Sequence, residues 1–269
     1  MRRPRRVLAT VEAVLRSQHP CDGLWRSDGA SASASYCRGD ARGRLGDLRA
    51  TATEIALVKQ LFPAAASYAD VYTRHGLLGP KSILVHCIYL EESEVEALAD
   101  SDAIAAFCPT SNLFLGSGLF DMQRLRKRSE PVRVGIATDV GGGTSYSMLQ
   151  TANEAYKVLQ LQGEQWPALQ PFYMMNHGNA AVLGLQDHIG SLDEAYEADI
   201  VVLDARATPA VEHRMECIEG NLAEELFLLM TLGDDRCVAE TYVAGKPSKP
   251  RKADVASHKA ASKLLADVT

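Results

Sequence analysis

The sequence has few of the features that mark several large classes of protein. Its six cysteines include no Cys-x-x-Cys pair and are scattered over 269 residues, which argues against a structural zinc knuckle or a disulfide framework. We therefore interpret them as free thiols. No apolar run approaches the roughly 18 residues that span a bilayer, and Glu12 interrupts the apolar stretch near the N-terminus. We expect neither a membrane anchor nor a secretory signal, and hence a cytoplasmic protein.

A surplus of positive charge is also missing. The chain has 28 Lys and Arg residues against 34 Asp and Glu residues, a formal net charge of −6. General binding to nucleic acid or to anionic membranes requires a positive surplus, so neither is expected as a partner. The glycine-rich strings GSG (116–118) and GGG (141–143) continue into neither a P-loop nor a dinucleotide-binding pattern, which disfavours phosphate binding. Small molecules or other proteins remain as candidate partners.

The first fifty residues differ in composition from the rest of the chain. They contain ten Arg, no Lys and five acidic residues, a net charge of +5, whereas residues 51–269 carry −11. Apart from one candidate short helix at 7–17, residues 1–53 show no periodicity, so we expect an irregular, poorly ordered segment. Such an Arg-, Ala- and Ser-rich composition is typical of organelle targeting, and a shifted reading frame of GC-rich DNA also produces it. The sequence leaves both explanations open.

Regular periodicity begins at Glu54 and predicts alternating helices and strands. Helical spacing occurs at 54–62, 68–78, 91–101, 120–129, 147–163, 172–185 and around 219–230. Apolar runs typical of buried strands occur at 82–87, 103–108, 132–139, 198–204 and 237–246. This alternation is characteristic of α/β proteins with a parallel sheet.

Two of the predicted strands end in residues that bind metals or move protons. His86 follows the run ILV, and Asp139 ends the run VGIATD. Parallel α/β proteins place their active sites at the carboxyl ends of strands, so both residues are candidate catalytic residues. The structural alternatives are a hydrogen-bonded core histidine and, for Asp139, a helix N-cap or an Asx turn. The three glycines at 141–143 would let the backbone approach a ligand closely.

The segment CPTSNLFLGSGLF (108–120) follows a predicted strand and is expected to form a loop. Long loops after barrel strands usually carry substrate contacts, which makes Ser111 and Asn112 candidate substrate-binding residues. The simpler alternative is a tight Ser/Asn/Gly connection that contacts no ligand.

Three strings resemble bacterial guanine deaminases, which are zinc hydrolases of the amidohydrolase superfamily. They are SILVHCIYLEESE, AFCPTSNLFLGSGLFDMQRLRK and VRVGIATDVGGGTSYSMLQTANEAYKVLQ, and the likeness extends from about Glu54 to about Lys246. Within them, SNLFLGSGLFD and TDVGGGTS are long and specific, whereas triazine hydrolases and cytosine deaminases resemble the same strands with different residues after the aspartate. SLDEAYEADIVVLD (191–204) is similar to the family segment that enters a small β-sandwich.

The resemblance implies a (β/α)8 TIM-like barrel, of which this chain holds the later strands, followed by a small C-terminal β-sandwich segment. It implies one zinc ion whose bound hydroxide attacks guanine and yields xanthine and ammonia, a step of purine catabolism. By position, Asp139 corresponds to the zinc-binding aspartate that also accepts a proton from the attacking water. His86 corresponds to the histidine that lies beside the metal and stabilises the substrate. The family tendency is to form a homodimer.

The resemblance also identifies elements that this chain lacks. The family has a His-x-His pair, which is absent from the seven histidines here, and a Thr-His-x-x-Glu string that supplies another zinc ligand and a proton shuttle. In an alignment without gaps from EIALVKQLF, Asp47 stands at the place of that histidine and Ala50 at the place of that glutamate. Catalytic zinc sites use about three protein ligands. We therefore predict an incomplete zinc site and little or no deaminase activity of this chain.

These expectations divide the chain into four segments. They are an irregular segment (1–53), the later part of an amidohydrolase barrel (54–190), return strands of a β-sandwich (191–250) and a polar tail (251–269). A complete barrel needs about 250 residues, which predicts a truncated or frame-disrupted guanine deaminase with an open sheet edge prone to aggregation or pairing. Two alternatives remain open. In the first, the chain is another amidohydrolase, such as a triazine or cytosine hydrolase. In the second, it is a non-catalytic half-barrel that serves as a partner protein.

Overall fold

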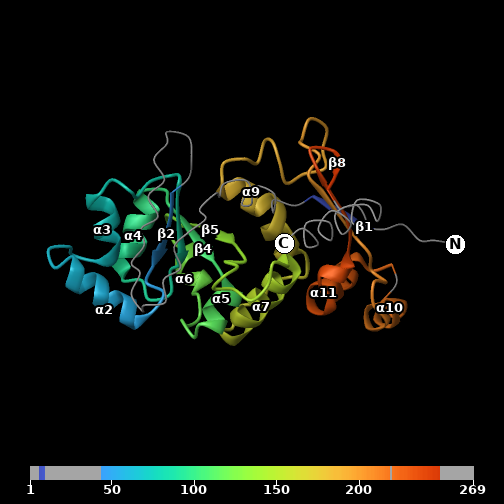
Figure 1. The fold of residues 1–269 in the computed structure, drawn as a ribbon, viewed down its shortest axis with the longest axis horizontal. Coiled ribbons are helices and arrows are strands. Elements are labelled where there is room, and N and C mark those ends of the chain that lie inside the picture. Colours follow the sequence, from blue (N-terminus) through green and yellow to red (C-terminus); the bar gives the residue numbers. More distant parts are fainter. Residues whose placement is uncertain (1–5, 10–43, 219, 249–269) are drawn as a thin grey trace, which may run out of the picture.

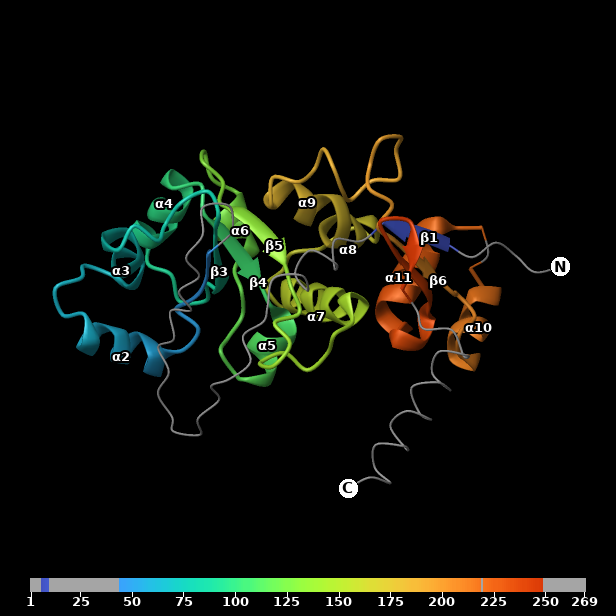
Figure 2. The ribbon, with the colours of Figure 1, turned by 45° about the horizontal axis from the view of Figure 1, so that its top comes forward.

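Two four-stranded sheets organise the part of the chain that the computed structural model describes, namely residues 6–9, 44–218 and 220–248 (Figure 1). One sheet is parallel and lies among helices α2 to α7; the other is antiparallel and lies beside α10 and α11 (Figure 2). None of the helices in these ranges has the length and apolar content that crossing a bilayer requires. The α/β class and the parallel sheet expected from the sequence are confirmed.

The parallel sheet has the strand order β2-β3-β4-β5. Its strands are Arg44–Leu48 (β2), Ser82–His86 (β3), Ile104–Phe107 (β4) and Arg133–Ile136 (β5). The last three coincide with predicted apolar runs, because strands covered on both faces are apolar throughout. In register, Leu48 lies opposite His86, and Phe107 lies opposite Ile136. The carboxyl ends of neighbouring strands therefore lie along one edge of the sheet.

Helices connect or follow these strands, and most of them begin after a residue whose side chain caps the helix. They are Ala52–Leu61 (α2), Tyr68–Arg74 (α3), Glu92–Asp100 (α4), Pro109–Phe114 (α5), Met122–Arg126 (α6) and Met148–Leu161 (α7). Thr51 caps α2 in a reciprocal capping box with Glu54, so this helix begins two residues before the predicted start. The expectation of a plain loop over 108–120 is wrong for 109–114, because Pro109 at the first helical position favours a helix there.

The chain after α7 forms the second sheet and its helices. The predicted helix 172–185 is a succession of Leu169–Tyr173 (α8), the π-helix Met174–Gly178 (η1) and Asn179–Val182 (α9). There follow Ile200–Leu203 (β6), Pro209–Glu216 (α10), Leu222–Leu232 (α11), the 3-10 turn Asp235–Cys237 (η2), Val238–Val243 (β7) and Lys246–Pro247 (β8). Strand β6 pairs antiparallel with β7 and with Arg6–Ala9 (β1), so the first and last strands of the described residues belong to one sheet.

The expectation of an irregular segment over 1–53 is wrong at three places, one of which is the start of α2 at Ala52. Residues 6–9 form β1, which also contradicts the candidate helix at 7–17 as far as Ala9, and residues 44–48 form β2. Strand β2 has only two large apolar residues, Leu45 and Leu48, so it shows no apolar run. Tertiary packing makes this segment a strand. Leu48 is fully buried, and Gly46 has no side chain that would collide with the ring of Tyr72. Residues 10–43 and the polar tail 251–269 lie outside the described residues.

The largest apolar cluster of the described residues joins the parallel sheet to the helices that follow it. Phe107 from β4 stacks on Phe120 with ring centroids 4.6 Å apart, and both rings are fully buried. Farther along, Tyr156 of α7 meets Phe227 of α11 edge to face at 5.3 Å, which attaches the C-terminal helices to the sheet domain. Aromatic pairs in this geometry are worth about 0.5–1.5 kcal/mol beyond the area that they bury.

The outer edge of β5 is closed by a side chain. The Oδ1 atom of Asn179 accepts a hydrogen bond from the Ile136 backbone N–H at 3.0 Å, and its Nδ2 donates to the Ile136 carbonyl at 2.8 Å. Asn179 thus satisfies both backbone groups that a neighbouring strand would bind. At the other edge, β2 has no neighbouring strand among the described residues, and Leu45 on it is 50% exposed.

We predict that Asn179→Leu destabilises the protein by about 1–3 kcal/mol, the cost of leaving a buried polar group unpaired. The measurement is the midpoint of urea unfolding. Asn153→Leu is the matched control, because Asn153 makes only one long bond, at 3.5 Å to the Thr231 carbonyl. Equal midpoints for the two variants would contradict the role of Asn179 at the edge.

A buried ion pair ties the end of β2 to α4. The Nη1 atom of Arg49 donates to the Oε2 atom of Glu94 at 2.6 Å, and Glu94 is 0% exposed. Glu94 also accepts from the backbone N–H groups of Ala69 and Glu91 at 3.1 and 2.8 Å. Its carboxylate therefore links β2, α3 and α4, and its charge is compensated by a cation and two amides.

We predict that Glu94→Gln lowers the free energy of unfolding by about 1.5–3 kcal/mol, the cost of weakening hydrogen bonds to a charged group, because Arg49 keeps Glu91 as its other ion-pair partner. Glu92→Gln is the control on the same helix, since Glu92 is exposed and pairs with Arg124 and Arg128 at the surface. Chemical denaturation of both variants measures the difference. A Glu94 variant as stable as the Glu92 variant would refute the assignment.

Candidate active site

Strained backbone gathers at the carboxyl edge of the parallel sheet. Arg49 after β2, His86 and Cys87 at the end of β3, and Asp139 after β5 all have left-handed φ values, between 47° and 74°. For residues other than glycine this region costs about 1–2 kcal/mol each. Such strain persists only where the surroundings impose it, and it is frequent at functional sites. The same edge holds the two residues that the sequence singled out.

His86 lies between two carboxylates. Its Nε2 atom is 3.7 Å from Oδ1 of Asp47 and 3.9 Å from Oδ2 of Asp139. The imidazole is buried, whereas the Asp47 side chain is 57% exposed and that of Asp139 is partly exposed. The structure thus brings together His86 and Asp139, which are 53 residues apart in the sequence, and adds Asp47 at the end of β2.

Helix α5 supplies the residues on the other side of the imidazole. The Nδ1–H group of His86 donates to Oδ1 of Asn112 at 2.8 Å, and Asn112 is 1% exposed. Ser111 is also fully buried, and its Oγ atom has no hydrogen-bond partner. A Cβ atom added to Gly142 would lie 2.7 Å from this Oγ, so Ser111 packs directly against the glycine turn. Both candidate substrate-binding residues therefore lie around the site, below its surface.

The turn after β5 is closely packed around Asp139. The Gly143 N–H donates to the Asp139 carbonyl at 2.5 Å, and the Thr110 hydroxyl donates to the Thr138 carbonyl at 3.0 Å. A Cβ atom on Gly143 would lie 2.1 Å from the Thr138 carbonyl oxygen. The absence of side chains at Gly142 and Gly143 therefore allows this close packing next to Asp139. That the glycines also let the backbone approach a ligand stays a prediction.

The electrostatics of the site concern one carboxyl and two thiols. Loss of hydration raises the pKa of Asp47, the carboxylates of Glu54 and Asp139 raise it further, and His86 lowers it. Because Asp47 is more than half exposed, solvent screens these effects. Burial also raises the pKa of Cys87 and Cys108, both of which are free. These cysteines remain protonated thiols near neutral pH and do not act as nucleophiles.

The residues at this edge do not fit a catalytic zinc ion. Such an ion needs about three protein ligands held at bonding distance from a common point. Within the described ranges no group of three or more His, Cys, Asp or Glu side chains could hold a metal ion. We therefore derive no chemical step through a metal.

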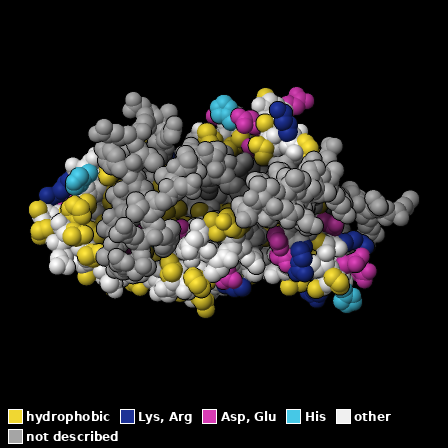
Figure 3. Space-filling view, viewed as in Figure 1, with side chains coloured by type: hydrophobic (Ala, Val, Ile, Leu, Met, Phe, Trp, Pro, Cys, Tyr) yellow, Lys and Arg dark blue, Asp and Glu magenta, His cyan; other side chains and the backbone are white. Residues whose placement is uncertain are grey.

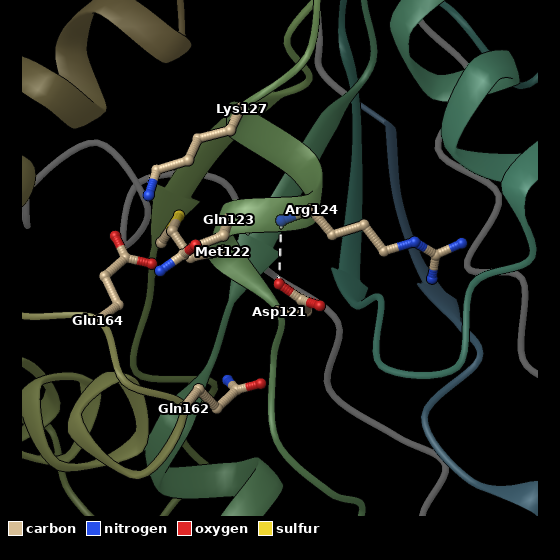
Figure 4. Close-up of a pocket in the computed structure, with 7 residues that line it drawn as sticks. All are labelled: Asp121, Met122, Gln123, Arg124, Lys127, Gln162 and Glu164. Atoms are coloured by element: carbon tan, nitrogen blue, oxygen red, sulfur yellow. Dashed lines mark hydrogen bonds between the residues drawn. The ribbon is translucent and has the colours of Figure 1, made fainter.

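Two other surface features lie outside this cluster. Hydrophobic side chains are visible over α2 and α3 and along the lower edge near α5 (Figure 3), where Phe114 is 68% exposed. A cavity of about 440 Å³ is lined by α6 and the residues after α7 (Figure 4). Its lining includes the oppositely charged side chains of Lys127 and Glu164. It also includes Asp121 and Arg124, which are joined by the hydrogen bond from the Arg124 backbone N–H that caps α6. It contains none of the site residues.

Sequence reasoning missed Arg49 and Glu94, which hold the end of β2 in place. A Glu at the third position of a helix is a recognisable capping signal, but it does not reveal that Glu94 is buried and paired with a residue 45 positions away. Asp47 was found only as the residue standing where the guanine deaminase resemblance places a histidine. The structure gives it a contact with His86 that the spacing alone does not indicate.

We predict that Gly143→Ala destabilises the turn by about 1–3 kcal/mol, because the added methyl group collides with backbone that has no room to move. Gly79→Ala is the control, since a Cβ atom there meets nothing within 4 Å. Urea unfolding compares the two variants. Equal stabilities would contradict the close packing of the turn.

Comparison with known proteins identifies the family. Residues 49–247 match the model of the amidohydrolase family. The guanine deaminase of Escherichia coli (strain K12) is 48% identical over 193 residues, which cover 72% of this chain and 43% of that protein.

Solved structures extend this similarity to the fold. The structure of E. coli guanine deaminase superposes with a TM-score of 0.72 at 45% identity, covering 77% of this chain and 48% of that one. A guanine deaminase from C. acetobutylicum, with guanine bound in its active site, gives a TM-score of 0.65 at 26% identity over 76% and 48% of the two chains. The chain spans about half the length of these relatives. Because the family match extends over most of its residues, the chain belongs to the amidohydrolase family.

Proposed function

We propose that this chain carries one half of a guanine deaminase active site and binds a purine at the carboxyl edge of its parallel sheet. The observation that supports this most is the convergence of His86 and Asp139, from two strongly matching segments, to 3.9 Å at that edge. The relatives of high identity that cover this segment are named guanine deaminases.

The proposed reaction is hydrolytic deamination of guanine. Water adds to the carbon that bears the exocyclic amine, one water proton passes by way of Asp139 to the departing amine, the C–N bond breaks, and xanthine and ammonia leave. Asp139 is the carboxylate that accepts a proton from the attacking water, and Nε2 of His86 faces the substrate beside it. Ser111 and Asn112 support purine binding from α5. The family resemblance implies that a bound zinc ion would supply the activated water.

We further propose that the isolated chain turns over guanine poorly. The sequence contains neither a His-x-His pair nor a Thr-His-x-x-Glu string, and Ala50 stands where the proton-shuttling glutamate is expected. Ala50 has no group able to carry a proton. A general acid or base is typically worth a factor of about 10²–10⁴ in rate, so its loss alone would suppress catalysis.

The open edge of β2 supports a second candidate function. Among the described residues no strand covers this edge, and Leu45 on it is half exposed. Unpaired strand edges bind further strands, so the chain would then act as a non-catalytic half-barrel that pairs with another polypeptide. A homodimer stays a prediction, as does a cytoplasmic location.

The test measures ammonia release and ligand binding by the purified chain. We expect a kcat/KM for guanine at least about 10² below that of E. coli guanine deaminase assayed in parallel with added zinc. We also expect xanthine to bind, and Asp139→Ala to weaken that binding, as measured by saturation-transfer NMR.

The outcomes separate the candidates. Guanine turnover at the rate of the E. coli enzyme would overturn the proposed loss of activity. Ammonia release only from cytosine or aminotriazines would contradict guanine as the substrate and would favour another amidohydrolase activity. A stable oligomer that binds no purine would favour the half-barrel partner.

A further inference from the structure

The ring of His86 is held by one strong contact. Its Nδ1 atom lies 2.8 Å from Oδ1 of Asn112, and both side chains are buried. An amide oxygen can only accept a hydrogen bond, so the proton of this bond belongs to Nδ1. The two carboxylates near Nε2, at 3.7 and 3.9 Å, are beyond hydrogen-bond distance. The orientation of the ring therefore depends on Asn112.

Asn112 is itself held rigidly. Its backbone N–H donates to the Cys108 carbonyl at 2.9 Å, and its carbonyl accepts from the Ser117 N–H at 2.8 Å, so both backbone groups are fixed by α5 and the turn after it. Its Nδ2 atom is buried and has no partner. Because the amide makes no other side-chain hydrogen bond, its position is explained by the bond to His86.

The backbone of His86 makes such support necessary. Its φ of 74° lies in the left-handed region, which directs the side chain differently from the preceding residues of β3. A residue in this conformation keeps it only when its surroundings hold it there. The hydrogen bond that His86 donates to Asn112 of α5, 26 residues away in the sequence, supplies this restraint.

We propose that Asn112 is a positioning residue for His86 and does not contact the purine itself. The Asn112 side chain accepts a hydrogen bond from Nδ1–H of His86. This bond orients the ring so that Nε2 faces the space between Asp47 and Asp139, where the substrate is expected. The expected effect on purine affinity rests on the proposed function. The inference gives Asn112 a positioning role in place of the direct substrate contact that the sequence suggested. Ligand-binding histidines are commonly oriented through their second nitrogen in this way.

The experiment records the ring nitrogens of His86 by long-range ¹H–¹⁵N NMR in the full chain and measures xanthine affinity in parallel. The variants are Asn112→Leu, which has a similar shape and no acceptor, and Asn112→Asp, which keeps an acceptor oxygen. The control is Ser117→Ala, which removes another buried and unpartnered polar atom of the same turn.

We expect a protonated Nδ1 in the unmodified chain, in the Ser117 variant and in the Asn112→Asp variant. In the Asn112→Leu variant the Nδ1 signal shifts toward that of an unprotonated nitrogen, and xanthine binds about fivefold to tenfold more weakly, the effect of losing one hydrogen bond. In the Asn112→Asp variant the ring-nitrogen signals of His86 again show a protonated Nδ1, as in the unmodified chain.

An unchanged His86 spectrum in Asn112→Leu would overturn the proposal, and weaker binding with that unchanged spectrum would identify a direct contact between Asn112 and the purine. If Asn112→Leu does not fold, Asn112→Asp decides: loss of the Nδ1 proton there refutes the proposal. If the unmodified chain binds no xanthine, the proposed function fails while the NMR result still tests the positioning of His86.

Discussion

Parallel pairing of β2, β3, β4 and β5 is the constraint on which the candidate site depends. Parallel strands end on the same edge of a sheet, so residues that follow different strands meet there whatever their separation in sequence. His86 at the end of β3 and Asp139 after β5 meet in this way. The buried pair of Arg49 and Glu94 anchors the first of these strands to α4, so the same edge is fixed by packing as well as by the backbone ladder.

Much of this architecture could be predicted because burial on both faces of a strand produces an apolar run. Strands β3, β4 and β5 follow this rule, and helices such as α2 have clear capping residues. Strand β2 could not be predicted in the same way, since its sequence RLGDL alternates polar residues with only two leucines. What makes it a strand is its pairing with β3 and the place of Gly46 under Tyr72, and neither is visible locally.

The site was predictable in its chemical groups but not in its contacts. His86 and Asp139 stand out because polar residues end apolar runs. The bond between His86 and Asn112 joins residues 26 positions apart, and it depends on a helix where the sequence indicated a loop. Family membership follows from long matching segments, whereas catalytic competence depends on a few side chains, and we propose that Ala50 stands where the family's glutamate is expected. The two properties can therefore separate in one chain.

The most direct test of this account is anomalous diffraction at the zinc absorption edge from crystals of the chain grown with zinc and xanthine. We predict no ordered zinc peak between His86 Nε2 and the Asp139 carboxylate, with the purine beside them. A fully occupied zinc ion bound jointly by Asp47, His86 and Asp139 would contradict the proposal that this edge positions substrate without holding a catalytic metal.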